Sequence, residues 1–139
     1  MKIVLDTSVL IAAFYKPLAG PSFSREVYDY VVQHEEGIVS LFILKEFREK
    51  CVKKLKFSIE KTLTYETLIR KKLVVQQVDD KKSLPADVRL RDPDDRPILQ
   101  LALAIRASIL LTWDKDLLVL KSVAHCAIRT PREFWDALS

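Results

Sequence analysis

The sequence of 139 residues predicts an α/β fold, a three-layer α/β/α sandwich in which helices cover both faces of a central parallel β-sheet. Short apolar runs rich in β-branched residues recur along the chain, as is typical of strands buried on both faces. Segments with apolar residues at helical spacing separate these runs, and that alternation is typical of parallel sheets. No repeat, low-complexity tract or linker interrupts the pattern, so we expect one domain over residues 1–139.

The first predicted strand covers residues 2–5 and ends at a charged residue, Asp6. A helix over residues 8–15 follows, and the hydroxyl of Thr7 or Ser8 can cap it. A carboxylate directly after a buried strand is energetically expensive unless it has a partner. Asp6 is therefore a candidate for binding a cation as well as the residue that ends a strand.

The second predicted helix covers residues 22–36, where apolar side chains follow a serine cap, and Gly37 is expected just past its end. The remaining elements continue the alternation. They are a strand at 37–40, a helix at 41–57, a helix that begins after Ser58 and includes the apolar Leu63, Leu68 and Ile69, a strand at 73–78, an apolar helix from Asp95 to Ala107, a strand at 108–112, a short helix at 115–120, and a last helix at 131–138 after the segment 127–130.

The composition is that of a soluble globular protein, with 49% apolar and 30% charged residues. Its net charge of +4 is compatible with a polyanionic partner but does not require one. The two cysteines lack CxxC spacing and the two histidines stand alone, which argues against a disulfide framework and against a zinc site. Asp6 interrupts the N-terminal apolar run, so we expect a cytoplasmic protein without a signal peptide or a membrane span.

Acidic residues recur at the ends of the predicted strands and on the helices beside them. Asp6 follows the first strand, while Asp114 and Asp116 follow the strand at 108–112. Asp95 opens the preceding apolar helix, and Glu46 lies near the edge of the buried stripe of another helix. The carboxyl ends of parallel strands meet at one edge of a sheet, where ligands bind. We therefore expect these five carboxylates to converge on one pocket.

Several carboxylates at short range raise one another's pKa values, and a divalent cation removes that electrostatic penalty. A ligand set of oxygen atoms without histidine or cysteine suits Mg²⁺ or Mn²⁺. Magnesium keeps several of its waters and binds phosphate oxygens, so such a pocket is typical of phosphoryl chemistry.

Four segments together resemble the PIN domain (PilT N-terminus) family. They are "IVLDTSVLIAA", the acidic helix "ILKEFREK", the block "RDPDDRPILQLALAIRASILLTWDKDLL", and "TPREFW" near the C-terminus. The resemblance spans nearly the whole chain and is most specific from Asp92 to Leu118. It is strongest toward the small bacterial branch described as VapC-like toxins of toxin–antitoxin pairs. It implies a PIN-like α/β/α fold, a Mg²⁺- or Mn²⁺-dependent ribonuclease that hydrolyses RNA phosphodiester bonds, a cognate antitoxin, and a homodimer.

The resemblance also implies roles for individual residues, matched position by position. The acidic quartet that would bind the metal and carry catalysis falls on Asp6, Glu46, Asp95 and Asp114. An accessory metal-binding acid falls on Asp116. Hydroxyl side chains expected to contact the substrate are Thr7, Ser8 and Thr112.

Two further positions concern the surroundings of this site. Asp92 is typical of the branch and is expected to support the ligands or the fold. Trp113 departs from the family pattern, in which a small, polar or basic residue is common, and its ring could narrow the cleft or stack on a base.

Each acid has an alternative interpretation. Asp95 could merely cap its helix, Asp116 could cap the helix at 115–120, and Glu46 could be an ordinary surface acid. Asp94 is expected to face solvent. A run of cations along the helix at 41–57 could track phosphates or simply be solvated. Its members are Lys45, Arg48, Lys50, Lys53, Lys54 and Lys56.

Three other functional classes remain open. A receiver-like phosphoacceptor also places aspartates at strand ends, but it needs an acid pair after the first strand, which "LDTS" lacks. A nucleotide-binding module is disfavoured because the chain has two glycines and no glycine-rich phosphate loop. A catalytically inactive module of the same fold that binds nucleic acid or protein would be expected to have lost part of the quartet.

Overall fold

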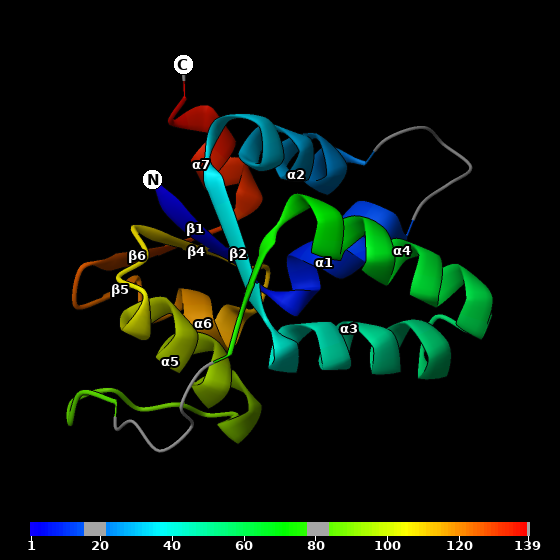
Figure 1. Ribbon diagram of the computed structural model, residues 1–139. Coiled ribbons are helices and arrows are strands. Elements are labelled where there is room, and N and C mark those ends of the chain that lie inside the picture. The colour runs from blue at the N-terminus through cyan, green and yellow to red at the C-terminus, as the bar shows by residue number, and fades with distance from the viewer. Residues whose placement is uncertain (16–21, 78–83, 139) are drawn as a thin grey trace.

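The computed structural model describes residues 1–15, 22–77 and 84–138, in which helices and strands alternate as the sequence predicts (Figure 1). The elements are β1 (Lys2–Leu5), α1 (Thr7–Phe14), α2 (Phe23–His34), β2 (Glu36–Ser40), α3 (Leu41–Lys53), α4 (Ile59–Lys72), β3 (Val74–Gln76), the 3₁₀ helix η1 (Pro93–Asp95), α5 (Arg96–Ala104), β4 (Ile109–Leu111), α6 (Lys115–Leu118), β5 (Ser122–Val123), β6 (Cys126–Arg129) and α7 (Pro131–Asp136). The predicted strand at 73–78 extends to residue 78, which lies outside the described residues.

The strands form one six-stranded sheet in the order β3-β2-β1-β4-β6-β5. All neighbouring pairs are parallel except β5 and β6, which are antiparallel. In Figure 1, α5 and α6 lie on one side of this sheet, and α1, α2 and α7 lie on the other. The predicted α/β/α sandwich is therefore confirmed, with the correction that one short edge strand runs against the others.

The strand order reverses next to β1, and this reversal positions the candidate site. From β1 the chain builds outward to β2 and β3, and it then returns to the other side of β1 to form β4. Leu5 at the end of β1 pairs with Leu111 at the end of β4, and the Asp6 amide donates to the Leu111 carbonyl. The residues that follow these two strands consequently lie side by side, at the kind of switch point where α/β sheets bind ligands.

Gly37 lies inside β2, in agreement with the predicted strand at 37–40, but the residue that caps the end of α2 is Glu35 and not this glycine. A β-carbon at this position would lie 2.6 Å from Leu73 Cδ2 and 3.0 Å from Val31 Cγ1. A larger residue would require the Leu73 methyl group to shift, because side chains of α2 and of the end of α4 lie directly against the strand here. The helix itself ends at His34 without a glycine.

Two further helices, α3 and α4, also differ from expectation. α3 ends at Lys53 rather than at residue 57, and the chain turns at Lys56 with a φ of 58°. Of the three apolar residues named for α4, Ile69 is buried, whereas Leu63 and Leu68 are exposed. Within the three described ranges, no helix has the length and apolar character needed to cross a membrane.

Candidate active site

A cavity of about 340 Å³ lies at the carboxyl end of the sheet and gathers acidic side chains from four parts of the chain. Its lining residues are Asp6, Ser8, Glu46, Lys50, Lys54, Asp92, Asp94, Asp95, Ile98 and Asp114. The structure therefore brings the four acids of the predicted quartet together. Asp94, which was expected to face solvent only, is exposed but also lines the cavity.

Asp6 is buried at the start of α1 and accepts hydrogen bonds at both carboxylate oxygens. Its Oδ1 accepts from the Thr7 amide at 2.7 Å, so Asp6 itself caps α1 in place of Thr7 or Ser8. Its Oδ2 accepts from Thr112 Oγ1 at 2.7 Å and from Ser8 Oγ at 3.0 Å. Burial nevertheless raises the pKa of Asp6, although these donors oppose the shift. The carboxyl is thus fixed in place but incompletely compensated for its loss of water.

The two hydroxyls that donate to Asp6 also accept backbone hydrogen bonds from the loop after β4. Ser8 Oγ accepts from the Trp113 amide at 2.9 Å, and Thr112 Oγ1 accepts from the Asp114 amide at 2.9 Å. Because each hydroxyl proton is directed at Asp6, its lone pairs are free to accept from those amides. The position of Asp114 is therefore set by the carboxylate of Asp6 through one intervening hydroxyl.

Asp95 is the acid with the least compensation from the protein. Its side chain is 4% exposed, makes no capping hydrogen bond to α5, and has no hydrogen-bond partner at Oδ2. Burial, followed by the nearby charge of Asp114, raises the pKa of Asp95 to about 8. The alternative that Asp95 merely caps the helix is therefore wrong. Asp92 instead caps η1, with its Oδ1 accepting from the Asp94 amide at 2.9 Å.

Asp95, Asp114 and Asp116 form the tightest acidic group. One carboxylate oxygen from each lies within 4.8 Å of the other two. Asp114 Oδ1 accepts from the Asp116 amide at 2.9 Å, so Asp114 is the residue that caps α6, and the alternative that Asp116 caps it is wrong. Arg91 approaches Asp116 at 3.9 Å, but its side chain is highly exposed and compensates little of the negative charge.

Glu46 faces the cavity from the middle of α3, with its side chain 17% exposed. Burial raises its pKa, and the nearby hydroxyl of Thr7 and the ammonium of Lys50 oppose that rise. The Thr7 hydroxyl is buried and has no hydrogen bond of good geometry, and Lys50 Nζ is 4.0 Å from Glu46 Oε1. Glu46 is therefore a cavity acid and differs from an ordinary carboxylate on a helix surface.

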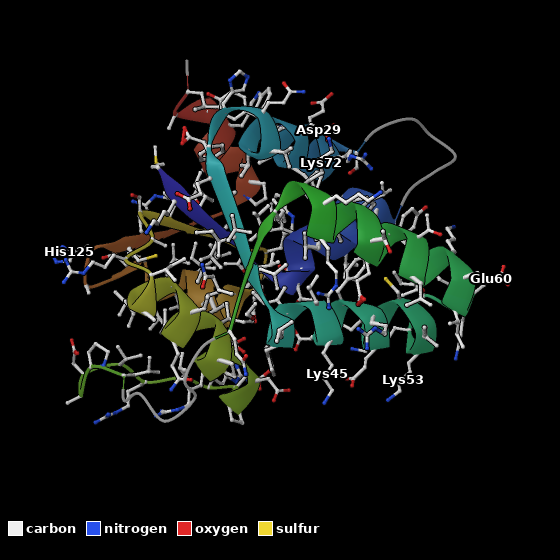
Figure 2. The ribbon with its side chains drawn as sticks, viewed as in Figure 1. Asp29, Lys45, Lys53, Glu60, Lys72 and His125 are labelled. Atoms are coloured by element: carbon white, nitrogen blue, oxygen red, sulfur yellow. The ribbon has the colours of Figure 1, made fainter. Side chains whose placement is uncertain are left out.

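The donor chemistry of the cavity fits a hard divalent cation. An unpartnered, buried carboxylate oxygen stands beside two further carboxylates at distances that one ion can span. Asp6 and Glu46 line the same cavity but lie outside this tight group. Neither histidine lines the cavity, and Figure 2 places His125 at the β5–β6 turn, far from α3.

The predicted hydroxyl contacts differ in their access to the cavity. Ser8 lines it, whereas Thr7 is buried and Thr112 is 0% exposed. Trp113 is 38% exposed, but its indole N–H donates to Ser24 Oγ on α2 at 3.0 Å, and its ring does not line the cavity. The sequence suggested that the Trp113 ring could narrow the cavity. In the structure the ring does not do so.

Comparison with known proteins identifies the domain. The family model described as "PIN domain" matches residues 2–116. The fold is similar to VapBC2 from Rickettsia felis, solved with a DNA fragment from their promoter, with a TM-score of 0.71 and 16% identity over 94% of this chain and 98% of that chain. It is also similar to Mycobacterium tuberculosis VapC20, described as a sarcin–ricin loop cleaving toxin, with a TM-score of 0.62 and 13% identity over 88% and 97% of the two chains. Among curated proteins, none matches the sequence.

Proposed function

The chain belongs to the PIN domain family, and from this premise we propose that it is a ribonuclease that requires Mg²⁺ or Mn²⁺ and hydrolyses RNA phosphodiester bonds. The reaction would take place in the cavity lined by Asp6, Glu46, Asp95 and Asp114. The single observation that carries this proposal is the buried Asp95 Oδ2, which has no partner in the protein and lies next to two other carboxylates. Such an atom is expected where a cation completes the site.

In this mechanism Asp95, Asp114 and Asp116 would hold the cation, and Glu46 and Asp6 line the cavity beside them. A divalent ion bound there would supply the chemistry of water activation and of charge neutralisation at the phosphodiester. No histidine lines the cavity to act as general base. The protein's own contribution is to fix several carboxylates at short range, where a bound cation would favour their ionised forms.

Hydroxyl residues would contribute in two ways. Ser8 lines the cavity and is proposed to contact the substrate. Thr112 is buried and bonded to Asp6 and to the Asp114 amide, so we propose that it positions the ligands and does not touch RNA. Thr7 is proposed to act beside Glu46, whose ionisation its hydroxyl favours.

We further propose that the protein is the toxin of a toxin–antitoxin pair, with an antitoxin partner and a homodimeric form. The similarity in fold to VapC20 and VapBC2 supports this proposal. Growth arrest on expression of the wild-type chain, but not of Asp95→Asn, would agree with a toxin. Light scattering of the purified chain tests the dimer, and a molecular mass near the 16.0 kDa of one chain would contradict it.

The decisive experiment for the enzyme is cleavage of single-stranded RNA with Mn²⁺, with Mg²⁺ and with a chelator. Asp95→Asn is the cleanest variant because no hydrogen bond of the protein depends on Oδ2. Asp87→Asn, a change of the same charge at an exposed position, is the matched control. We expect cleavage by the wild type and the control in metal, and loss of at least about a hundredfold in Asp95→Asn. Equal cleavage by both variants, or cleavage in chelator, would contradict the proposal.

A further inference from the structure

We propose that Lys50 on α3 and Lys54 at the C-terminal cap of α3 bind successive phosphates of the substrate and thereby orient a single RNA strand in the acidic cavity. This inference rests on the proposed ribonuclease function and names the residues that receive the backbone of the substrate. Three features carry it: the placement of the two lysines, the different engagement of the other cations on the helix, and the charge balance of the cavity.

The two lysines share one face of α3 with a residue of the proposed site. Glu46, Lys50 and Lys54 follow one another at intervals of four residues, and all three line the cavity. Four residues of α-helix advance about 6 Å, so the three side chains form a row that leads away from the acids. A nucleic-acid strand that is bound at the acidic end would therefore extend past two ammonium groups, first that of Lys50 and then that of Lys54.

The other cations of this helix have different surroundings. Arg48 forms a two-pronged ion pair with the buried Glu66 of α4, with Nη2 lying 2.7 Å from Oε1 and 3.1 Å from Oε2. Arg48 therefore joins α3 to α4. Lys45 and Lys53 extend away from α3 on its outer side (Figure 2), and neither lines the cavity. The run of basic residues seen in the sequence is consequently divided into a structural arginine, two outward lysines and two cavity lysines, while Lys56 lies past the end of α3.

The charge balance of the cavity explains why lysines are needed there. Six carboxylates and two ammonium groups line it, and a phosphate would be repelled from the acidic end unless a cation is bound there. Lys50 lies 4.0 Å from Glu46, the outer limit of an ion pair, and its side chain is 40% exposed. Its N–H donors are therefore accessible to a phosphate. The acidic end would hold the scissile phosphate through the cation, and the lysines would hold the phosphates next to it.

The test compares two double variants that remove the same charge from the same helix. Lys50→Gln/Lys54→Gln alters the cavity, and Lys45→Gln/Lys53→Gln alters the outer side of α3. Binding of a fluorescent ten-nucleotide single-stranded RNA is measured by anisotropy in Ca²⁺, which oxygen ligands also bind, over a series of KCl concentrations. Steady-state cleavage in Mn²⁺ provides the values of KM and kcat.

We expect the cavity variant to bind RNA about tenfold more weakly at low salt, with the slope of log Kd against log salt reduced by about 1.4, or about 0.7 for each lost phosphate contact. KM should rise by more than kcat falls, since the lysines bind the backbone away from the reacting bond. The outer variant should change Kd by less than about threefold. Lys50→Arg/Lys54→Arg should retain the binding of the wild type.

Equal losses in the two double variants would overturn the inference, because the effect would then be one of net charge. An unchanged salt slope in the cavity variant would overturn it as well. Circular dichroism and the thermal midpoint must match the wild type, and the arginine variant shows whether the positions tolerate exchange. RNA that binds to the wild type but is not cleaved in any metal would contradict the proposed enzyme, while the salt slopes would still decide the role of the lysines.

Discussion

The Asp95 carboxyl is held in surroundings that disfavour its ionised form. It is buried, lies beside Asp114, and lacks a hydrogen bond at Oδ2. With a pKa of about 8, this group is largely protonated near neutral pH when no cation is present. A residue in such a position lowers the stability of the folded chain, which is typical of functional sites.

The first prediction concerns the neutral replacement at this position. Asp95→Asn removes the carboxyl that must ionise in a buried, acidic environment, so the metal-free protein should melt at a higher temperature at pH 8. The increase in thermal midpoint that Mn²⁺ gives the wild type should disappear. Scanning fluorimetry with chelator and with Mn²⁺ measures both effects. A lower midpoint in chelator, together with a preserved response to Mn²⁺, would contradict the role given to Asp95.

The second prediction concerns the hydroxyl between Asp6 and Asp114. Thr112→Val keeps the shape of the side chain but leaves the Asp114 amide without its acceptor and Asp6 without one donor. The free energy of unfolding should fall by about 1–3 kcal/mol, and RNA cleavage should also decline. Thr112→Ser, which keeps the hydroxyl, should recover most of both. Urea denaturation and the cleavage assay measure the two effects, and equal behaviour of the valine and serine variants would refute this role.

The sequence predicted which acids meet, because residues that follow neighbouring parallel strands must lie at one edge of the sheet. The sequence did not predict which of these acids caps a helix and which has no hydrogen-bond partner in the protein. The division between Asp92 as a cap and Asp95 without one depends on the 3₁₀ turn at Pro93, which no periodic pattern reveals. The presence of Lys50 in the cavity could have been found from its spacing of four residues from Glu46.

Among the described elements, β2 has a close packing contact at Gly37. This glycine sits where Val31 of α2 and Leu73 at the end of α4 close over the strand. Both neighbouring side chains are buried, so a methyl group added at Gly37 would have to displace packed atoms.

The third prediction follows from that contact. Gly37→Ala should lower the free energy of unfolding by about 1–3 kcal/mol, because the new β-carbon would lie 2.6 Å from Leu73 Cδ2. In the background of Leu73→Ala, the same change should be much less harmful, and a double-mutant cycle in urea measures the difference. Additive effects of the two substitutions would show that the crowding at Leu73 is not the cause.

Element boundaries were predicted less well than the elements themselves, for identifiable reasons. α3 ends without a glycine, since Lys56 adopts the positive φ that a glycine usually supplies, and the amphipathic pattern continues past the true end. β5 consists of two residues held by pairing with β6, which is too short for a periodic signal. Leu63 and Leu68 fit a helical pattern but face outward, because α4 packs mainly through other positions.

The molecule as a whole concentrates uncompensated carboxylates at one edge of its sheet. Burial raises the pKa values of Asp6, Glu46 and Asp95, and the last rises from 3.8 to about 8. When the pKa of an acid is higher in the folded state than in the unfolded state, the contribution of that acid to stability is fully present at pH values below the unfolded-state pKa. This contribution is lost as the pH rises through the folded-state pKa. The metal-free protein should therefore be less stable at pH 8 than at pH 5.5.

That fourth prediction is checked by thermal unfolding in chelator across this range. The midpoint should fall as pH rises from 5.5 to 8, and Mn²⁺ should restore it at pH 8 by binding only the folded state. Asp95→Asn should flatten the dependence, since its side chain does not titrate there. A midpoint that stays constant, or one that rises equally in wild type and variant, would contradict the assignment of these pKa values.

The sequence was most informative about the architecture of the whole molecule. The alternation of buried strands with helices predicted the α/β/α sandwich, and the strand order placed Asp6 and Asp114 together at the reversal beside β1. The antiparallel pairing at the edge was missed, because βαβ patterns say nothing about a hairpin after the last crossover.

The paired hydroxyls around Asp6 have a consequence for how mutants of this family member are interpreted. An asparagine at this position would turn its NH₂ group either toward the Thr7 amide, which donates to Oδ1, or toward both hydroxyls, which donate to Oδ2. In the first orientation two donors would oppose each other, and in the second each hydroxyl would lose the Asp6 oxygen that accepts its proton while still accepting from the Trp113 or Asp114 amide. An inactive Asp6→Asn protein would thus mix two defects, a lost charge and a disturbed hydrogen-bond network, whereas Asp95 Oδ2 accepts no hydrogen bond that a substitution would break.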